Sequence, residues 1–528
     1  MSAPSRRPKG RPPGRRRLRN RPRNRRASDS GSPGTLRIGV ATSDNGPPAA
    51  SGARGEPSLA ARTEDALERA AAINRRVQAF LHLDREGALA TARALDRQSP
   101  DCRGPLFGLP VAVKDNIAVR GLPSTSGSAL LRDYRAPYDA TVVTRLRQAG
   151  AIILGTANLD EFGMGSSTTR GFRGPTRNPV DPTRITGGSS GGPAAAVAAG
   201  AVPAALGTDT GGSVRQPAAH CGIFAIRPTY GRVSRYGITA YASSFDQVGC
   251  LATDLRVLGH VLSQIAGGDP RDATSVSRKV PDFAAAAARP ELPRRIVTVG
   301  DADLEVLDAP SQRAFHAAVG RFEEAGCEIR RIGLPNPESS VAAYYLLACA
   351  EASSNLSRFD GIRYGHRRAG QESLPTTFRE SRTQGFGTEV RRRILLGTTV
   401  LSRGYRDAIY GAATEARRQI TARVLSAFDH GALLLLPITK VPPRHLADPV
   451  PATADYDGDR FTILAALAGV PAIAVPAGER SGLPFGVELM APPWNEAALF
   501  SAAAAFSAIP SAAARRSRSP SPGAAGVR

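Results

Sequence analysis

Two glycine-flanked serine sites lie within one stretch, Ile185–Val214, and this stretch constrains the fold more than any other part of the chain. The first site reads GGSSGG and contains Ser189, and the second reads DTGGS and contains Ser213. Glycines beside a serine permit tight turns with positive φ and let a substrate approach closely, and successive free N–H groups can bind an anion. A run of small apolar residues, Pro193 to Ala205, joins the sites and predicts an alanine-rich helix. We therefore expect the two serines to belong to one built site.

Short apolar runs alternate with helical patterns along the rest of the chain. This alternation predicts the α/β class, with a mixed sheet that is largely buried. The predicted strands cover 104–113, 151–154, 296–300, 328–332, 433–437, 472–476 and 484–490. The predicted helices cover 59–74, 85–96, 139–148, 312–325, a long helical region from Tyr344 to about Phe428, and 496–508.

The net charge of +23 for 528 residues belongs mostly to the two ends of the chain. Residues 1–30 hold twelve Arg or Lys against one Asp, and residues 510–528 hold four arginines. We interpret 1–56 as a disordered basic leader rich in Arg, Pro and Gly, 57–510 as the folded domain, and 511–528 as a disordered Ser/Arg/Pro tail. Two other interpretations of the leader stay open, a nucleic-acid-binding arm and a transit peptide that lacks the usual helix.

Cysteine usage and hydropathy indicate the compartment. The five cysteines form no CxxC pair, which is typical of a reduced, cytoplasmic protein and predicts no metal site. No run of 18 apolar residues is present, so we expect no transmembrane helix.

Lysine is scarce, with four lysines among the 69 basic residues. One of them, Lys114, directly follows the apolar run 109–113, where a buried strand should end. Arginine stays protonated in proteins, whereas a buried lysine can lose its proton. Lys114 is therefore a candidate base, and the alternative is a surface lysine that extends from a strand end.

A serine nucleophile needs a base. The first site also satisfies the G-x-S-x-G pattern of α/β-hydrolases, for which His430 or His445 would have to supply the base. With Lys114 as the base, the backbone N–H groups of Thr210, Gly211, Gly212 and Ser213 are candidates for an oxyanion hole. Phosphate binding by the glycine loops is a third interpretation, but the P-loop pattern and its lysine are missing.

The motifs GGSSGG, DTGGSVRQPA and VAVKDN together resemble the amidase signature family, and the resemblance extends over about 58–510. It implies one α/β domain with a mixed central β-sheet covered by helices on both faces. It further implies that Ser213 is the acyl-ester nucleophile, that Ser189, preceded by a cis peptide bond, relays the proton, and that Lys114 is the general base. In contrast to the usual family pattern, Arg227 replaces a lysine and His220 replaces an aromatic residue.

Within the family the chain most resembles the A subunits of bacterial glutamyl-tRNA(Gln)/aspartyl-tRNA(Asn) amidotransferases. The stretches that carry this resemblance are DEFGMGSS (160–167), PTYGRVSRYG (228–237), EASSNLSRFDG (351–361) and EVRRRILLGT (389–398). It implies hydrolysis of glutamine, with Arg393 on the α-carboxylate, Asp459 on the α-ammonium and Tyr344 lining the pocket. It also implies a heterotrimer in which a B subunit uses the ammonia, ATP and Mg²⁺ to convert misacylated tRNA, a small C subunit clamps the pair, and this chain holds no cofactor.

Two rival functions stay open from the sequence. One is a stand-alone amidase that hydrolyses a small carboxamide without partner subunits. The other is a non-catalytic nucleic-acid-binding protein that uses its basic ends, against which the intact set Lys114, Ser189 and Ser213 argues.

Overall fold

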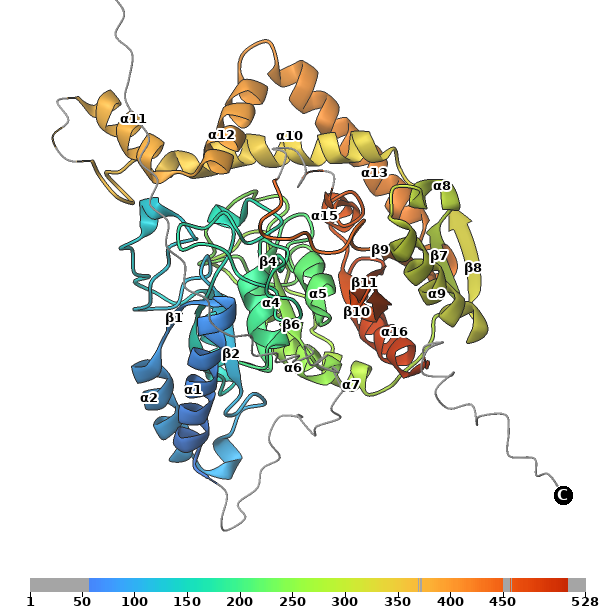
Figure 1. The fold of residues 1–528 in the computed structure, drawn as a ribbon, viewed down its shortest axis with the longest axis horizontal. Helices are drawn as coiled ribbons and strands as arrows, with labels where there is room; N and C mark the ends of the chain where they lie inside the picture. Colours follow the sequence, from blue (N-terminus) through green and yellow to red (C-terminus); the bar gives the residue numbers. More distant parts are fainter. Residues whose placement is uncertain (1–56, 369, 371–372, 450–455, 457, 511–528) are drawn as a thin grey trace, which may run out of the picture. The chain divides into compact units, whose positions relative to one another are not determined.

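The structure is a computed structural model. It describes residues 57–510 except 369, 371–372, 450–455 and 457 (Figure 1). The predicted leader, 1–56, and the predicted tail, 511–528, lie outside the described residues.

The described residues form one mixed sheet of 11 strands in the order β1-β3-β2-β4-β6-β5-β10-β11-β9-β7-β8 (Figure 1). The strands β3, β2 and β4 are parallel neighbours, and most of the other pairs are antiparallel. The predicted mixed sheet is confirmed. The strands are β1 (Phe80–Leu83), β2 (Pro110–Lys114), β3 (Ile152–Ala157), β4 (Ala204–Asp209), β5 (Phe224–Arg227), β6 (Gln247–Ala252), β7 (Arg295–Val299), β8 (Glu328–Ile332), β9 (Leu433–Pro437), β10 (Ala472–Arg480) and β11 (Leu483–Met490).

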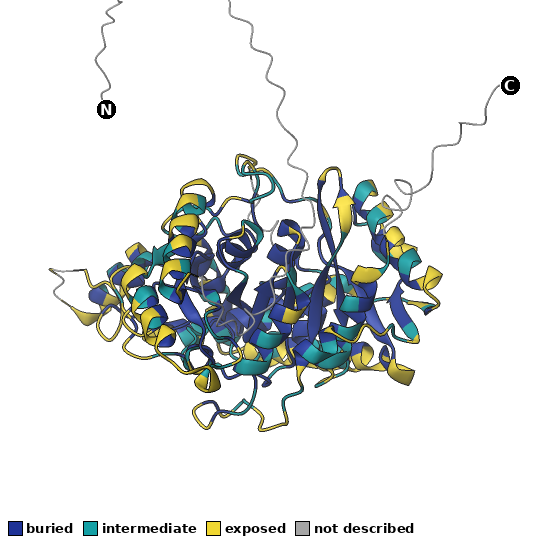
Figure 2. Ribbon diagram, turned by 90° about the horizontal axis from the view of Figure 1, so that it is seen from below, coloured by how far each residue is buried: buried dark blue, intermediate teal, exposed yellow. Residues whose placement is uncertain are grey.

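Helices cover both faces of this sheet. Side chains alternate between the faces of a strand, and in β2 Val111 and Val113 join one hydrophobic core whereas Ala112 joins the other. The central strands accordingly lie between helices and are buried (Figure 2). The α-helices are α1 (Leu59–Val77), α2 (Arg85–Asp96), α3 (Thr141–Gln148), α4 (Gly191–Ala198), α5 (Arg215–Cys221), α6 (Leu255–Ile265), α7 (Phe283–Ala287), α8 (Asp301–Leu304), α9 (Ala309–Glu324), α10 (Pro337–Asn355), α11 (Leu374–Gly385), α12 (Thr388–Leu401), α13 (Gly411–Ser426), α15 (Ile463–Ala468) and α16 (Glu496–Ala508).

The long helical region expected from Tyr344 to Phe428 is four separate helices, α10 to α13, and the first of them begins earlier, at Pro337. Glycines mark two of the interruptions: α11 ends at Gly385, and α12 ends before Gly404, which has a positive φ of 92°. Several elements were not expected from the sequence, among them β1, β5, β6 and α6. Two of these strands, β1 and β5, have only four residues, too few for a period of two to stand out.

All five cysteines are free thiols, and four of them are buried. None of the helices in the described ranges combines the length and the apolar character needed to cross a bilayer.

The imidazole of His220, in α5, is buried without a hydrogen bond that would offset the loss of contact with water. It is 4% exposed, and neither ring nitrogen has a hydrogen-bond partner within the described part of the chain. Burial, assisted by the nearby Arg480 cation, lowers the pKa of His220 from 6.5 to about 3. The unfolded chain therefore binds a proton here between about pH 6.5 and pH 3 that the folded chain does not, and acidification through this window destabilises the fold.

We predict that His220→Phe makes the protein more resistant to acid. Relative to wild type, the free energy of unfolding of the variant should rise by about 1.4 kcal/mol for each pH unit below 6. Urea unfolding at pH 7, 6 and 5 measures this difference. The exposed His366 provides the control substitution, His366→Phe, which should follow wild type. An equal loss of stability on acidification in wild type and His220→Phe would contradict the prediction.

Candidate active site

The site is assembled where parallel strands end. Lys114 is the last residue of β2 and Asp209 the last of β4, and β2 pairs in parallel with both β3 and β4. The carboxyl ends of parallel strands meet at one edge of a sheet, which is where α/β folds bind their ligands. The two serine loops flank β4, because α4 follows the first loop and leads directly into this strand, and the second loop leads from it into α5.

The amine of Lys114 lies inside the protein, at 0% exposure. Its Nζ lies 2.8 Å from Ser189 Oγ, 2.8 Å from Ser190 Oγ and 2.9 Å from Thr208 Oγ1. Burial lowers the pKa of Lys114 to about 7, against the opposing effect of the carboxylates of Asp160, Asp209 and Asp246. A substantial fraction of this amine is therefore neutral near pH 7.

Hydrogen bonds from other elements hold the first serine loop. The peptide bond between Gly188 and Ser189 is cis, as the resemblance implies. Gly188 N–H donates to Gln216 Oε1 in α5 at 2.8 Å, and Gly191 N–H donates to Thr168 Oγ1 at 2.9 Å. The carboxylate of Asp160 accepts backbone N–H groups from residues 167–170 and so holds Thr168 in place.

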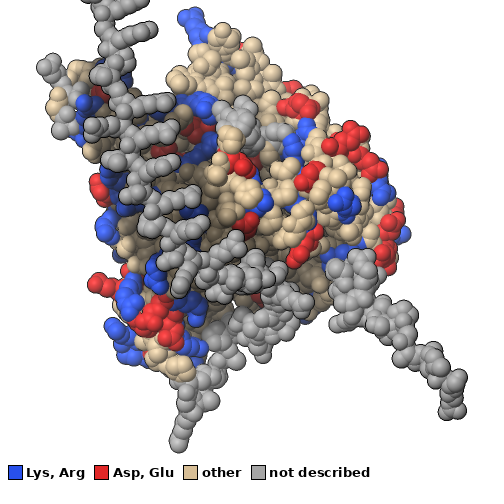
Figure 3. All heavy atoms as spheres, in the orientation of Figure 1, with Lys and Arg blue, Asp and Glu red and all other residues tan. Residues whose placement is uncertain are grey.

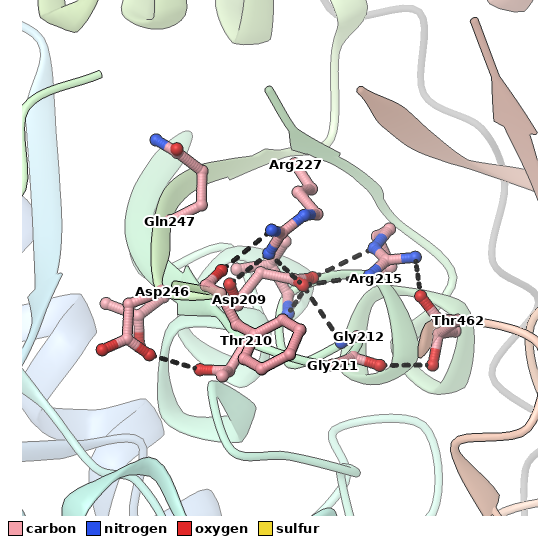
Figure 4. Close-up of polar contacts among 12 residues, drawn as sticks. Asp209, Thr210, Gly211, Gly212, Arg215, Arg227, Asp246, Gln247 and Thr462 are labelled. Carbon is pink, nitrogen blue, oxygen red and sulfur yellow. Dashed lines mark hydrogen bonds and ion pairs between the residues drawn. The ribbon is translucent and has the colours of Figure 1, made fainter. Parts of the chain in front are cut away.

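A buried ion network holds the second serine loop (Figure 4). The carboxylate of Asp209 accepts the N–H groups of Gly212 at 3.0 Å and Val214 at 3.2 Å, which closes the turn around Ser213. Two fully buried guanidinium groups, from Arg215 and Arg227, also bind this carboxylate. Although burial alone would raise it, the pKa of Asp209 stays well below its usual range because of these two cations.

Glu488, in β11, completes the network. It accepts a hydrogen bond from Arg215 Nη1 at 2.6 Å, and its side chain is fully buried. Burial raises the pKa of Glu488 to about 7, although Arg215 acts in the opposite direction. Asp209, Glu488, Arg215 and Arg227 therefore form one buried, hydrogen-bonded network, in which Asp209 is ionised and Glu488 is partly protonated near pH 7.

Ser213 lies against the first loop, since its carbonyl accepts the backbone N–H of Ser190 at 3.0 Å. It is also less deeply buried than Ser189, which is 1% exposed. Of the four expected oxyanion donors, Gly212 N–H donates to Asp209 instead. In the part of the chain that the structure describes, no acceptor engages the N–H groups of Gly211 and Ser213.

The three expected pocket residues come together beside the second loop. The Tyr344 ring packs on Gly211, because an added Cβ there would lie 2.5 Å from its hydroxyl. The neighbouring Tyr345 joins the other two: its hydroxyl donates to Asp459 at 2.7 Å, and its ring lies 5.2 Å from the guanidinium carbon of Arg393. Arg393 is 3% exposed and so is not part of a solvated helix face.

Several residues of the site were not identified from the sequence. They are Asp160, Ser166, Thr208, Gln216, Tyr241 and Tyr345. Asp160, Ser166 and Gln216 lie inside the quoted stretches DEFGMGSS and DTGGSVRQPA, and Thr208 and Tyr345 each lie next to a residue that was identified. The available signal was therefore a position within or beside a motif. No group of three or more His, Cys, Asp or Glu side chains suited to a metal ion occurs within the described ranges.

Curated relatives match most of the chain. The A subunit of glutamyl-tRNA(Gln) amidotransferase from Psychrobacter sp. is 45% identical over 455 residues, which cover 84% of this chain and 91% of that protein. The proteins of the same name from Geobacter sp. and Chloroflexus aurantiacus are 44% and 46% identical, over 85% of this chain and 94% and 92% of theirs.

Solved structures also match most of the chain. The crystal structure of the glutamyl-tRNA(Gln) amidotransferase A subunit from Thermotoga maritima matches with a TM-score of 0.69 and 38% identity, over 85% of this chain and 90% of that one. The peptide amidase from Stenotrophomonas maltophilia matches with a TM-score of 0.70 and 30% identity, over 89% of this chain and 95% of that one. The family model described as Amidase matches residues 61–500, and the chain therefore belongs to the amidase signature family.

Proposed function

We propose that this chain is the glutamine-hydrolysing component of a tRNA-dependent amidotransferase, which releases ammonia to convert Glu-tRNA(Gln), or Asp-tRNA(Asn), to its amidated form. The observation that carries the proposal is the buried contact of 2.8 Å between Lys114 Nζ and Ser189 Oγ, at a lysine whose pKa is near 7. The names of the relatives supply the substrate.

The mechanism begins with neutral Lys114. A neutral amine has two N–H donors and one lone pair, and Ser190 Oγ already donates to Thr208 O at 3.1 Å, so Ser190 accepts from the lysine. The lone pair is then available to the hydroxyl of Ser189. In the proposed reaction Ser189 passes its proton to Lys114 and takes the proton of Ser213, whose Oγ attacks the amide carbon.

The negative charge that develops on the amide oxygen is stabilised by the backbone N–H groups of Thr210, Gly211 and Ser213 in the second loop, because the N–H of Gly212 binds Asp209. Protonated Lys114 then gives its proton back to Ser189, which passes one proton to the leaving nitrogen. The C–N bond breaks, ammonia departs, and the acyl ester on Ser213 remains. Water then attacks this ester with Ser189 and Lys114 as the base, which releases glutamate.

Arg393 would bind the α-carboxylate of glutamine, Asp459 its α-ammonium group, and Tyr344 would line the pocket. Tyr345 supports this assignment because it contacts both Arg393 and Asp459, so a cationic and an anionic group flank one aromatic side chain. An amino acid zwitterion presents the complementary pair of charges.

The relatives are named as A subunits, so the proposal includes partners. We propose a heterotrimer with B and C subunits in the cytoplasm, in which the B subunit uses ATP and Mg²⁺ and binds the misacylated tRNA, while this chain needs no cofactor. In the face that Figure 3 shows, basic and acidic side chains are interspersed over the described surface. The basic ends on which the nucleic-acid-binding interpretation depends, 1–56 and 511–528, lie outside the described residues.

A stand-alone amidase is the second candidate. Structures named as a peptide amidase and a 6-aminohexanoate cyclic dimer hydrolase match with TM-scores of 0.70 and 0.74. Ammonia release from L-glutamine and from a panel of simple amides, with and without the B and C subunits, separates the two functions. Preference for glutamine that increases with the partners supports the amidotransferase, and partner-independent hydrolysis of other amides supports the alternative.

We predict that Ser213→Ala lowers glutamine hydrolysis by roughly 10⁴-fold or more, because no other group can form the acyl ester. Ammonia release and trapping of the acyl-enzyme by mass spectrometry measure the effect. Ser426→Ala, at an exposed serine in α13, is the matched control and should retain full activity. Substantial activity in Ser213→Ala would exclude this serine as the nucleophile.

We predict that Lys114→Arg is almost as inactive as Lys114→Met, since arginine does not lose its proton. In wild type, kcat/KM should rise with pH and level off above about 7, because Lys114 is protonated below its folded pKa of about 7. Thermal unfolding of both variants shows whether they fold. An active Lys114→Arg, or a flat profile in wild type from pH 6 to 9, would place the base elsewhere.

A further inference from the structure

One carboxylate, that of Glu389 near the start of α12, organises the surroundings of Arg393. It is 6% exposed. Its Oε1 accepts from Arg393 Nε at 2.9 Å and from the Tyr456 hydroxyl at 3.0 Å. Its Oε2 binds Arg170 Nη1 at 2.7 Å and also Arg392 Nη1. A single buried anion therefore holds three cations, which come from α12 and from the 160–170 loop.

These contacts leave one edge of Arg393 open. Nε donates to Glu389, and Nη1 donates to the Tyr241 hydroxyl at 2.7 Å. Among the residues that the structure describes, Nη2 has no partner. The rings of Tyr241, Tyr345 and Tyr456 lie 5.2–5.6 Å from the guanidinium carbon and limit its rotation. Nε and Nη1 of the Arg393 guanidinium are thus held by hydrogen bonds, and Nη2 is available to a ligand.

Charged groups of both signs surround Glu389. The guanidinium groups of Arg170, Arg392 and Arg393 contact it, and Glu161 lines the adjacent cavity together with it. A cavity of about 360 Å³ lies beside it, lined in part by Arg170, Glu389 and Arg392. Although burial acts to raise the pKa of Glu389, Arg393 and Arg170 lower it overall, so the carboxylate is ionised at neutral pH. The ionised carboxylate therefore holds Arg393 and the two neighbouring arginines together.

We propose that Glu389 is a positioning residue that determines specificity: by fixing Nε of Arg393 and holding Arg170 and Arg392 nearby, it directs the free Nη2 at the carboxylate of the amide substrate. This inference rests on the proposed function, because it concerns how glutamine is selected at that same site. Glu389 touches none of the reacting atoms and acts through Arg393. Its loss should therefore weaken recognition of the carboxylate and leave the chemistry at Ser213 intact.

The test is Glu389→Gln, which keeps the size of the side chain and removes its charge. Two substrates are compared, L-glutamine and 4-aminobutanamide, which is glutamine without its carboxylate. Since a lost charge-assisted contact corresponds to about a tenfold change in an equilibrium constant, KM for glutamine should rise about tenfold or more. The kcat for glutamine, and kcat/KM for 4-aminobutanamide, should change by less than about twofold, because neither depends on carboxylate recognition.

The control is Glu415→Gln. Glu415 forms an ion pair of the same type on α13, with Arg418 at 2.7 Å, but it is exposed and lies on a different helix. It should leave kcat and KM unchanged for both substrates. An equal loss on both substrates in Glu389→Gln, or no change on either, overturns the inference, and the first of these would mean that Glu389 only supports the fold. Wild-type protein that hydrolyses 4-aminobutanamide but not glutamine would instead refute the proposed function.

Discussion

The burial of one lysine amine is the constraint on which the rest of this structure depends. Lowering the pKa of Lys114 from 10.5 to about 7 corresponds to about 5 kcal/mol against the charged form. The fold tolerates the amine because Ser189, Ser190 and Thr208 surround it with hydroxyl groups at hydrogen-bond distance. An aliphatic side chain in this position would remove one contact from each hydroxyl, although Ser190 Oγ would keep its bond to Thr208 O and Thr208 Oγ1 its bond from Asn116 Nδ2.

The buried lysine site depends on two parallel strands that end side by side and on a buried ion network that holds the second serine loop. β2 delivers Lys114 and β4 delivers Thr208 and Asp209 at adjacent strand ends, so the contact between amine and hydroxyl follows from the strand register. Asp209 then turns the chain sharply by accepting two N–H groups from the next residues. A lone buried carboxylate would be costly, and Arg215 and Arg227 neutralise it at the point where the turn must stay rigid.

Sequence patterns predict the helices, strands and turns that neighbouring residues form, but they do not predict contacts between residues far apart in the chain. The strands 328–332 and 433–437 and the helices 85–96 and 496–508 were predicted with the observed limits, because apolar spacing and turn residues lie within each segment. Glycine-rich motifs likewise identify both serine loops. By contrast, Tyr345 and Gln216 act across separations of 114 and 28 residues, on Asp459 and Gly188, and no spacing rule encodes such contacts. Gly212 was expected to donate its N–H to the oxyanion. Its N–H binds Asp209, and the sequence does not reveal this contact because it depends on the folded turn.

Chemistry and selectivity occupy different parts of the fold, and this separation explains how relatives with different names share one architecture. The lysine and both serines lie on the central sheet and its loops, where any shift would disturb buried charges. The groups proposed to select glutamine lie on α10, α12 and the segment before α15, outside the sheet. These groups are not among the side chains that hydrogen-bond Lys114, which are Ser189, Ser190 and Thr208. The structure of a peptide amidase accordingly shares this fold at 30% identity although its name differs.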